Sequence, residues 1–270
     1  MKEKTMDTAN GVVHYWISEK WDAARETMVF LHGITADHTM FEGQIAYFSG
    51  IYNLIAWDAP AHGKSRPYLR FSYGDAVECL KTILISHQVD AAVFVGQSFG
   101  GFVAQSFLLR YPQMVKGFIG IDTTPYGTAY YSKSDIWWLR QVEWMARSIP
   151  RTLLKKSLAR NSTASPQGYH NMLSMLEPYG KEELCRLLGI GYAGFLQENQ
   201  DMTISCPVLL LLGEKDNVGK VKQYNWAWAR DTGYPLIVIK HAAHNSNVDQ
   251  PEAVNREITQ FMQAIQRDYG

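Results

Sequence analysis

The stretch at residues 92–101, Ala-Val-Phe-Val-Gly-Gln-Ser-Phe-Gly-Gly, limits the possible folds of this chain more than any other. Residues 93–95 form a β-branched and aromatic run typical of a buried strand, and residues 102–109 have helical apolar spacing. Between them lies the pattern G-x-S-x-G, in which glycines let a strand and a helix approach closely. We therefore predict a strand, a sharp turn and a helix, with the hydroxyl of Ser98 projecting beside the positive end of the helix. An ordinary serine in a glycine-rich turn is the alternative.

Short apolar runs alternate with helical segments on both sides of this turn. Strands are expected at residues 12–17, 27–31, 52–57, 93–95, 117–121, 207–212 and 236–239. Helices are expected at residues 39–48, 73–87, 102–109, 221–229 and 252–266. The dipeptide Asn10-Gly11 predicts a hairpin that opens the fold. Strands separated by helices predict an α/β fold with a mostly parallel sheet, whose site lies at the carboxyl ends of the strands.

The alternation stops between residues 126 and 202. Helices are expected there in succession at residues 133–149, 151–160, 166–176 and 181–197. Helices inserted between two strands of a parallel sheet must lie over one end of it, and at the carboxyl end they would cover the site. We therefore predict a core domain made of residues 1–125 and 203–270, and a helical cap, or lid, at residues 126–202.

A serine that takes part in acyl transfer needs a base to remove its proton and an acid to orient that base. The chain places Ser98, Asp216 and His244 in this order, each after an apolar strand. We expect His244 to be the general base and Asp216 to hold the opposite ring nitrogen. Taken singly, His244 has the alternative of an ordinary loop histidine and Asp216 that of a helix cap, but their joint order and placement favour a catalytic triad.

The site also needs an oxyanion hole, because the substrate carbonyl oxygen becomes negative during attack. Backbone N–H groups serve this purpose, and losing one such donor typically costs about 10² to 10³ in rate. The N–H of Phe99 directly follows the nucleophile and is one predicted donor. The N–H of Ile34, which follows His32-Gly33, is the predicted second donor.

These stretches make the chain resemble the α/β-hydrolase fold superfamily. The matching stretches are Phe30-Leu31-His32-Gly33, Trp57-Asp58-Ala59-Pro60-Ala61-His62-Gly63-Lys64-Ser65, Gly96-Gln97-Ser98-Phe99-Gly100-Gly101, Leu212-Gly213-Glu214-Lys215-Asp216, and Ala243-His244 with the later Pro251-Glu252. The order serine, acid, histidine also agrees with that superfamily. The resemblance implies a mostly parallel central sheet flanked by helices, an inserted helical cap and a serine triad, and it leaves the substrate open.

Three positions test this resemblance. Ala61 stands where the family usually has glycine, which puts the local backbone shape in question rather than the chemistry. Members that cleave carbon–halogen bonds or epoxides have an aspartate at the position of Ser98, so those activities are disfavoured. Some members take the triad acid from the strand before the cap, where Asp122 stands here. Asp216 is the favoured acid, and Asp122 stays as the alternative.

Three further polar residues lie on loops that face the predicted site. In the family pattern, the positions of Asp58 and Ser65 support their loop, so a structural role is favoured over a functional one. Asp37 follows the segment His32-Gly33-Ile34, which carries the second predicted donor and which we call the oxyanion loop. Asp37 is at least as well suited to cap a helix as to contact substrate.

Composition narrows the function classes. A chain of 270 residues with 46% hydrophobic residues and a formal net charge of +0 can bury a large core, and it has no basic excess to neutralise nucleic-acid phosphates. Residues 1–10 lack the apolar core of a signal peptide and no run suits a membrane span, so a cytoplasmic location is expected. Cys79, Cys185 and Cys206 have no metal-ligand spacing and are expected to be free thiols. The oligomeric state stays open.

The predicted cap is rich in aromatic and thioether side chains. Those expected to contribute to a substrate pocket are Tyr126, Trp137, Trp138, Trp144 and Met145, although packing against the core is the usual role of such residues. The resulting hypothesis is a hydrolase of small to medium, mostly apolar carboxylic esters, or of lactones or thioesters. Its substrate would be a small molecule, and the mechanism needs neither a metal nor an organic cofactor.

Other activities are compatible with the same three residues. Within enzymes, carbon–carbon bond hydrolysis, cofactor-free peroxidation and some lyase reactions use the same triad. A ligand-binding or signalling protein that turns over slowly is an alternative of a different class. A purely structural protein is disfavoured, because stability does not require serine, acid and histidine at three separate strand ends.

Overall fold

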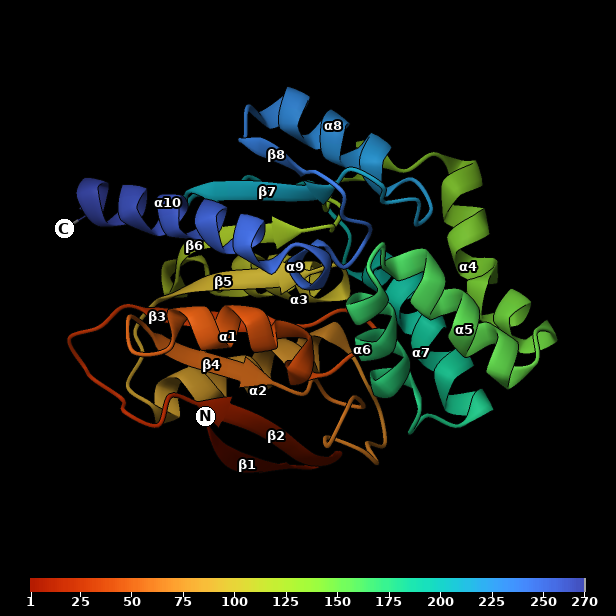
Figure 1. The fold of residues 1–270 in the computed structure, drawn as a ribbon, viewed down its shortest axis with the longest axis horizontal. Coiled ribbons are helices and arrows are strands. Elements are labelled where there is room, and N and C mark those ends of the chain that lie inside the picture. The colour runs from red at the N-terminus through yellow and green to blue at the C-terminus, as the bar shows by residue number, and fades with distance from the viewer. Residues whose placement is uncertain (270) are drawn as a thin grey trace.

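A sheet of eight strands forms the centre of the computed structural model, which describes residues 1–269 (Figure 1). The strands are β1 (Lys2–Thr8), β2 (Gly11–Ile17), β3 (Thr27–Leu31), β4 (Asn53–Trp57), β5 (Ala92–Gln97), β6 (Val115–Ile121), β7 (Val208–Gly213) and β8 (Leu236–Ile239). Their spatial order is β1-β2-β4-β3-β5-β6-β7-β8. β1 and β2 form the predicted antiparallel hairpin, β2 pairs antiparallel with β4, and all other pairs are parallel. The expected α/β class with a mostly parallel sheet is confirmed.

The central strands are buried along their whole length. Every residue of β3, β4, β5 and β7 is buried, which explains why these strands are continuous apolar runs rather than alternating ones. In the parallel register Phe30 pairs with Val95, and Val95 pairs with Ile119. The carboxyl ends of β3, β5 and β6 therefore finish side by side, and the loops that leave them share one edge of the sheet.

Helices cover both faces of this sheet (Figure 1). On one face lie α1 (Glu42–Phe48) and α10 (Pro251–Tyr269), which contact each other, and on the other lie α2 (Tyr73–Ser86) and α3 (Phe99–Arg110). α8 (Val221–Thr232) packs on β7 and β8, and the short α9 (Ser246–Asp249) precedes α10. α10 buries Val254, Ile258 and Met262 at helical spacing, so its apolar stripe closes that side of the core.

The region between β6 and β7 is helical, as expected. It contains α4 (Lys133–Ser148), α5 (Arg151–Ser162), α6 (Pro166–Leu176) and α7 (Lys181–Ala193), and a 3-10 turn at Gly194–Gln197 completes it. Ser132 and Asp135 form a capping box that starts α4, and Ser165 caps α6 with Pro166 as its first residue. α4 packs on α7 and α5 packs on α6, beyond the carboxyl ends of the strands (Figure 1). We call residues 126–202 the helical insertion.

Several element ends differ from the sequence-based expectation by a few residues. The helix expected at residues 181–197 ends at Ala193 and continues as the 3-10 turn, and the strand expected from residue 117 already begins at Val115. The helix expected at residues 151–160 extends to Ser162. These shifts arise because apolar periodicity does not mark where the last backbone hydrogen bond forms.

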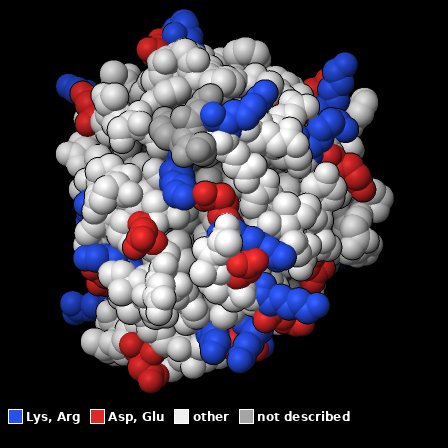
Figure 2. Space-filling model, turned by 90° about the vertical axis from the view of Figure 1, so that its left-hand side faces the viewer, with Lys and Arg blue, Asp and Glu red and all other residues white. Residues whose placement is uncertain are grey.

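The surface carries charges of both signs. On the described part of the face in Figure 2, Lys and Arg side chains lie beside Asp and Glu side chains, and neither sign forms an extended patch. This mixture agrees with the formal net charge of +0. Among residues 1–269, each helix is either too short or too polar to cross a bilayer.

Candidate active site

Ser98 occupies the turn between β5 and α3 that the G-x-S-x-G pattern predicts. Its φ of 49° and ψ of −114° lie outside the ordinary backbone regions. Position 100, two residues later, requires glycine for a steric reason, because a Cβ on Gly100 would lie 1.9 Å from the carbonyl oxygen of Leu31. Helix α3 can therefore start close to β3, and the Ser98 hydroxyl projects above the carboxyl edge of the sheet.

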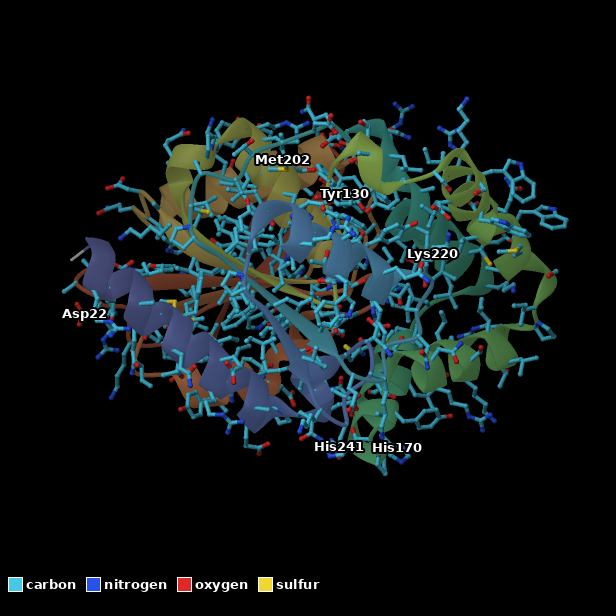
Figure 3. The ribbon with its side chains drawn as sticks, turned by 90° about the horizontal axis from the view of Figure 1, so that it is seen from above. Asp22, Tyr130, His170, Met202, Lys220 and His241 are labelled. Atoms are coloured by element: carbon cyan, nitrogen blue, oxygen red, sulfur yellow. The ribbon has the colours of Figure 1, made fainter. Side chains whose placement is uncertain are left out.

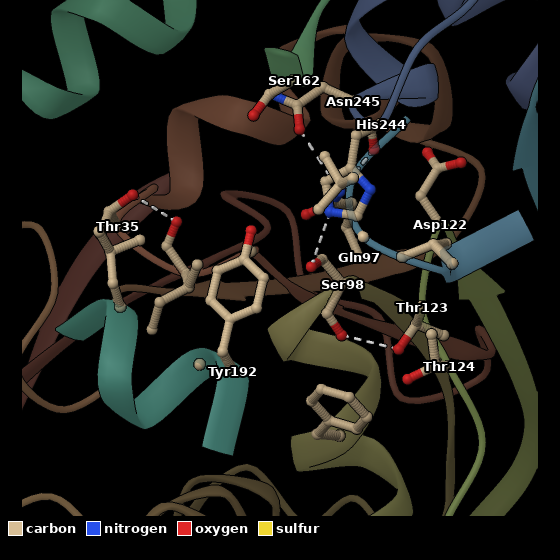
Figure 4. A pocket seen from close by; sticks show the side chains of 18 of the residues that line it. Thr35, Gln97, Ser98, Asp122, Thr123, Thr124, Ser162, Tyr192, His244 and Asn245 are labelled. Carbon is tan, nitrogen blue, oxygen red and sulfur yellow. Dashed lines mark hydrogen bonds between the residues drawn. The ribbon is translucent and has the colours of Figure 1, made fainter. Parts of the chain in front are cut away.

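Three side chains from separate loops form a hydrogen-bonded chain at this edge, and Figure 4 shows two of them, Ser98 and His244. Oγ of Ser98 lies 2.9 Å from Nε2 of His244, and Nδ1 of His244 lies 2.8 Å from Oδ2 of Asp216. An ionised carboxylate only accepts hydrogen bonds, so Nδ1 carries the ring hydrogen and Nε2 accepts from the Ser98 hydroxyl. The structure thus brings together the three residues that their order in the sequence indicated.

The loops that carry the acid and the histidine follow β7 and β8. Asp216 is 1% exposed, and its Oδ1 accepts a hydrogen bond from the N–H of Val218 at 2.8 Å, which fixes the carboxylate toward the ring. The last residue of β5, Gln97, donates from Nε2 to the carbonyl oxygen of His244 at 2.7 Å. The histidine loop is therefore fastened to the strand that carries the serine.

The electrostatics favour His244 as a proton acceptor. Burial by itself would lower the pKa of His244, because the charged imidazolium loses its hydration. The charge of Asp216 and its hydrogen bond, together with the nearby Asp122, outweigh burial and raise the His244 pKa above its usual value of 6.5. The ring consequently takes up a proton more readily than a free imidazole, which is the property that a general base needs.

Asp122, the alternative acid, lies beside this chain and has different partners. Its carboxylate accepts hydrogen bonds from the N–H of Gly213 at 2.6 Å and from the N–H of Ser246 at 3.0 Å. Burial and the charge of Asp216 raise the Asp122 pKa to about 7. Asp122 thus joins the end of β7 to the loop after His244, whereas the carboxylate on Nδ1 of His244 belongs to Asp216.

The two predicted donors of the oxyanion hole lie at the start of α3 and in the loop after β3. Phe99 is the first residue of α3, so its N–H has no acceptor within the helix and points from the helix start. Ile34 and Ser98 both line the same cavity, and Ile34 follows the end of β3. Thr35 holds this loop with a φ of 63° and an Oγ1 hydrogen bond to the carbonyl oxygen of Ile34 at 2.6 Å.

Among the side chains that the structure describes, those of residues 1–267, Asp37, His38 and Asp58 form the one group of candidate metal ligands, with ligand atoms within 4.8 Å of one another. These atoms already have protein partners: Oδ1 of Asp58 accepts from Nδ1 of His38 at 2.7 Å, and Oδ2 accepts from the N–H of Lys64 at 2.6 Å. Asp37 caps the 3-10 turn that follows it, and Ser65 donates to the carbonyl oxygen of Asp58 at 2.7 Å. All these contacts support loops, in agreement with the structural roles that the sequence favours.

Ala61, at the position where the resemblance leads one to expect glycine, has a φ of 69°. It keeps the left-handed backbone that glycine adopts freely, and it does so as an alanine with an exposed fraction of 1%. The hydrogen bonds around Asp58 hold the loop after β4 in this shape. The N–H of Ala61 also donates to the carbonyl oxygen of Ser65 at 3.1 Å. The departure from the family pattern therefore leaves the loop conformation intact.

A cavity lies over Ser98, between the carboxyl edge of the sheet and the helical insertion (Figure 4). Its empty volume, which includes space that is open to solvent, is about 860 Å³. Most of its wall is apolar. Lys220, which is labelled in Figure 3 and directly precedes α8, forms an ion pair with Asp135 of α4 at 2.6 Å. Residues of the insertion that line the cavity are Tyr131, Leu139, Leu158, Ser162, Met172, Leu188, Gly191, Tyr192 and Phe195.

The tryptophans expected in the substrate pocket lie elsewhere. Trp137, Trp138 and Trp144 have exposed fractions of 55%, 56% and 70%, and they lie outside the cavity wall. The physical reason is the orientation of α4, which packs its aliphatic side on α7 and contributes Leu139 to the cavity. The expectation that these indoles face the substrate is therefore corrected by the structure.

The other two expected pocket residues are also outside the cavity wall. Tyr126 is 3% exposed, its hydroxyl lies 2.7 Å from Oγ of Ser106, and its ring stacks near Phe195. Met145 is half-buried on α4. Tyr126 is thus a core residue behind the cavity, because the chain leaves the cavity wall after Thr124.

The sequence predicts the helix at residues 181–197, but none of its residues is among those expected to line the pocket. α7 places Leu188, Gly191 and Tyr192 on the cavity, and Phe195 follows in the 3-10 turn. The signal was present, since apolar residues recur there at helical spacing through Leu184 and Leu188. Apolar periodicity alone does not indicate which of these residues face the cavity, because it marks the buried side of the helix as a whole.

Known proteins resemble the chain over nearly its whole length. A family model described as the alpha/beta hydrolase fold matches residues 26–251. The 3-oxoadipate enol-lactonase 2 of Acinetobacter baylyi is 26% identical, over 89% of this chain and 90% of the relative. The pimeloyl-[acyl-carrier protein] methyl ester esterase of Pectobacterium carotovorum is 24% identical, over 93% of this chain and 98% of the relative.

Solved structures agree with this result. A thermophilic esterase from Thermogutta terrifontis superposes with a TM-score of 0.79 at 20% identity, and covers 98% of this chain and 99% of its own. The enol-lactonase of Burkholderia xenovorans superposes with a TM-score of 0.78 at 16% identity, and covers 96% of this chain and all of its own, 100%. The family match, the sheet order and the turn at Ser98 lead to one conclusion: the chain belongs to the alpha/beta hydrolase fold family.

Proposed function

We propose that this hydrolase cleaves small to medium, mostly apolar carboxylic esters through Ser98, His244 and Asp216. The observation that carries the proposal is the hydrogen-bonded chain from Asp216 through His244 to a serine held in a strained turn. Relatives named as esterases and enol-lactonases support cleavage of an ester bond. Lactones and thioesters present the same acyl carbon and are included in the proposed class.

The proposed reaction passes through an acyl-enzyme. Oγ of Ser98 attacks the ester carbonyl carbon while Nε2 of His244 takes its proton, and the N–H groups of Phe99 and Ile34 stabilise the oxyanion. The bond to the leaving alcohol then breaks, and the alcohol oxygen takes the proton from His244. Water attacks the acyl carbon with His244 again as base, the carboxylic acid leaves, and the proton returns to Ser98. Throughout, Asp216 stabilises the imidazolium.

The cavity supports this substrate class. Side chains such as Leu139, Leu158 and Phe195 favour an uncharged acyl or alcohol part, and Lys220 is already paired with Asp135. We further propose that residues 126–202 act as a cap on a core domain made of residues 1–125 and 203–270. The position of α7 above the site, with residues on the cavity wall, supports that division.

Hydrolysis of p-nitrophenyl esters of increasing acyl length tests the proposal, with the native protein and Ser98→Ala measured in parallel. Loss of a triad serine is expected to lower turnover on the order of 10⁴- to 10⁶-fold. A fluorophosphonate probe, located by mass spectrometry, should modify Ser98. Ser106→Ala is the matched control, because that serine lies in the middle of α3, away from the cavity, and it should leave both labelling and turnover in place.

The possible outcomes separate the alternatives. Ester turnover that persists in Ser98→Ala would overturn the proposal. Labelling of Ser98 without turnover of any ester would indicate an activated serine that acts on another bond, such as the carbon–carbon bond of a diketone. Absence of both labelling and turnover would favour a ligand-binding protein.

A further inference from the structure

The hydroxyl of Tyr192 extends from α7 into the cavity, toward the space in front of Ser98 (Figure 4). Among the residues that the structure describes, no side chain or carbonyl group is recorded as its hydrogen-bond partner. Tyr192 is half-buried and its hydroxyl is accessible from the cavity, so a substrate that fills this mostly apolar cavity removes the hydration of the hydroxyl. The free hydroxyl therefore suggests that the bound substrate supplies the acceptor.

Close packing fixes the position of this tyrosine. The preceding residue, Gly191, lies so near the oxyanion loop that a Cβ there would be 2.6 Å from Cγ1 of Ile34. Helix α7 thus rests directly on the residue that contributes one predicted oxyanion donor. Tyr192 consequently stands at a fixed distance from the reacting carbonyl group rather than on a mobile segment.

Three other hydroxyl groups on the cavity wall, those of Thr123, Thr124 and Tyr131, have partners within the protein. Oγ1 of Thr123 donates to the carbonyl oxygen of Ser98 at 2.8 Å, and Oγ1 of Thr124 lies 2.7 Å from the hydroxyl of Tyr131. Tyr131 in turn donates to the carbonyl oxygen of Pro125 at 2.7 Å. These groups hold the loop after β6, whereas the hydroxyl of Tyr192 stays available to a ligand.

The protonation state of Tyr192 suits a donor. Burial, and then the charge of Asp216, raise its pKa to about 12. The phenol therefore keeps its proton throughout the range in which His244 can act as a base. It can donate a hydrogen bond to a neutral or negative oxygen, and it does not compete with His244 for a proton.

The location of Tyr192 indicates which part of the substrate it contacts. The leaving alcohol must lie beside Nε2 of His244, from which it takes its proton. In Figure 4 the ring of Tyr192 stands between Thr35 and Ser98, on the side of the oxyanion loop. That side is where the acyl part extends when the leaving group occupies the side of His244.

We propose that Tyr192 is a specificity-determining residue that donates a hydrogen bond to a second oxygen on the acyl part of the substrate. The preferred substrates are then esters or lactones whose acyl chain carries a carbonyl, ether or hydroxyl oxygen close to the scissile carbonyl group. This inference rests on the proposed ester hydrolysis and narrows it. A site that binds such an oxygen disfavours an alkyl analogue, because the hydroxyl is then left unpaired.

The test compares two p-nitrophenyl esters of equal size, the butanoate and the methoxyacetate, in which an ether oxygen replaces one methylene group. Each is measured with the native protein and with Tyr192→Phe. The ratio of kcat/KM, methoxyacetate over butanoate, removes effects on folding and on the general activity of the site. We expect Tyr192→Phe to lower that ratio about tenfold, the effect of one neutral hydrogen bond at the upper end of its usual range.

Tyr130→Phe is the matched control. Tyr130 lies on the 3-10 turn before α4, outside the cavity wall, so the same atom is removed without a change at the site (Figure 3). Its ratio should equal that of the native protein. The thermal midpoint of each variant confirms that both fold.

Two results would overturn the inference while leaving ester hydrolysis in place. If kcat/KM for both esters stays unchanged in Tyr192→Phe while turnover still depends on Ser98, the hydroxyl does not contact the acyl chain. An equal loss with both esters would assign the hydroxyl to the oxyanion instead. Turnover of either ester that persists in Ser98→Ala would remove the proposed function and, with it, the inference.

Discussion

At the scale of single residues, the site contains two residues with strained backbone conformations, each directly after one of two neighbouring strands. Ser98 follows β5 with a φ of 49°, and Asp122 follows β6 with a φ of 48°. Such conformations cost on the order of 1–3 kcal/mol each and persist only where other contacts hold them. Here the N–H of Ser98 bonds to the carbonyl oxygen of Ile121 at 2.9 Å, and the N–H of Asp122 bonds to that of Leu211 at 2.8 Å. The sheet therefore extends its hydrogen bonds by one residue into the site.

Replacement of Asp122 by asparagine should change the pH dependence of stability. Because folding raises the Asp122 pKa from 3.8 to about 7, the folded protein binds this proton more tightly than the unfolded chain, so stability is lost as the pH rises through that range. Asp122→Asn lacks this titration but cannot accept both hydrogen bonds. We expect it to be less stable than the native protein by about 1 kcal/mol at pH 4.5, with the difference smaller or reversed at pH 8.

Denaturant unfolding at the two pH values measures this effect. Asp231→Asn serves as the control, because Asp231 lies on the exposed surface of α8. It should shift stability equally at both pH values. A deficit of Asp122→Asn that grows between pH 4.5 and pH 8 would contradict the buried, proton-binding role of Asp122.

At the scale of elements, α7 connects the helical insertion to the oxyanion loop. Its glycines differ in what they face: a Cβ on Gly191 would meet Cγ1 of Ile34 at 2.6 Å, whereas a Cβ on Gly189 would meet the terminal Oε2 of Glu143 at the same distance. Ile34 is fixed by its loop, but the end of a glutamate side chain can rotate away. The same substitution on one helix therefore has two different consequences.

Gly191→Ala should lower kcat/KM about 10- to 100-fold, because displacement of α7 or of Ile34 disturbs the oxyanion site. Its melting temperature should change little, since the gain in helix propensity of about 1 kcal/mol offsets part of the overpacking. Gly189→Ala should keep its activity. Ester kinetics and thermal denaturation of the two variants check this, and equal activity of both would contradict the close contact at Ile34.

At the scale of the whole molecule, polar contacts fasten the helical insertion to the core around its edge. Asp249 of α9 makes several of these contacts. Its carboxylate accepts hydrogen bonds from the N–H groups of Ala164 at 2.7 Å, Ser165 at 2.9 Å and Ala243 at 2.9 Å. The same carboxylate thus holds the connection between α5 and α6 and the residue before His244. The position of the insertion and that of the general base are consequently coupled.

Asp249→Ala should destabilise the protein by about 2–4 kcal/mol, because three N–H groups lose a charged acceptor. The connection at residues 163–165 should then open to proteases under native conditions. Limited proteolysis with mass spectrometry and thermal unfolding measure both effects. Asp231→Ala, at an exposed carboxylate, should change neither, and a resistant Asp249→Ala would show that the insertion is held in another way.

How much of the site could be predicted depended on the range of the interactions involved. The turn at Ser98 follows from a five-residue pattern, and the relation of Asp216 and His244 to strand ends follows from apolar runs next to each of them. The pocket wall could not be predicted in this way. Trp137 and Trp144 have the large aromatic side chains that are typical of a pocket. They are nevertheless exposed, because α4 turns its aliphatic side toward α7.

The sequence by itself determined the α/β alternation, the strand–turn–helix at Ser98, the order of the site residues and the helical nature of residues 126–202, since each depends on neighbours a few positions away. Only the tertiary structure decided which carboxylate meets Nδ1 of His244, because both Asp122 and Asp216 follow strands that end at the same edge. It also decided that Tyr192, rather than the tryptophans of α4, faces the cavity. The side of a helix that faces a site is set by packing against distant segments, and the helix's own residues do not specify it.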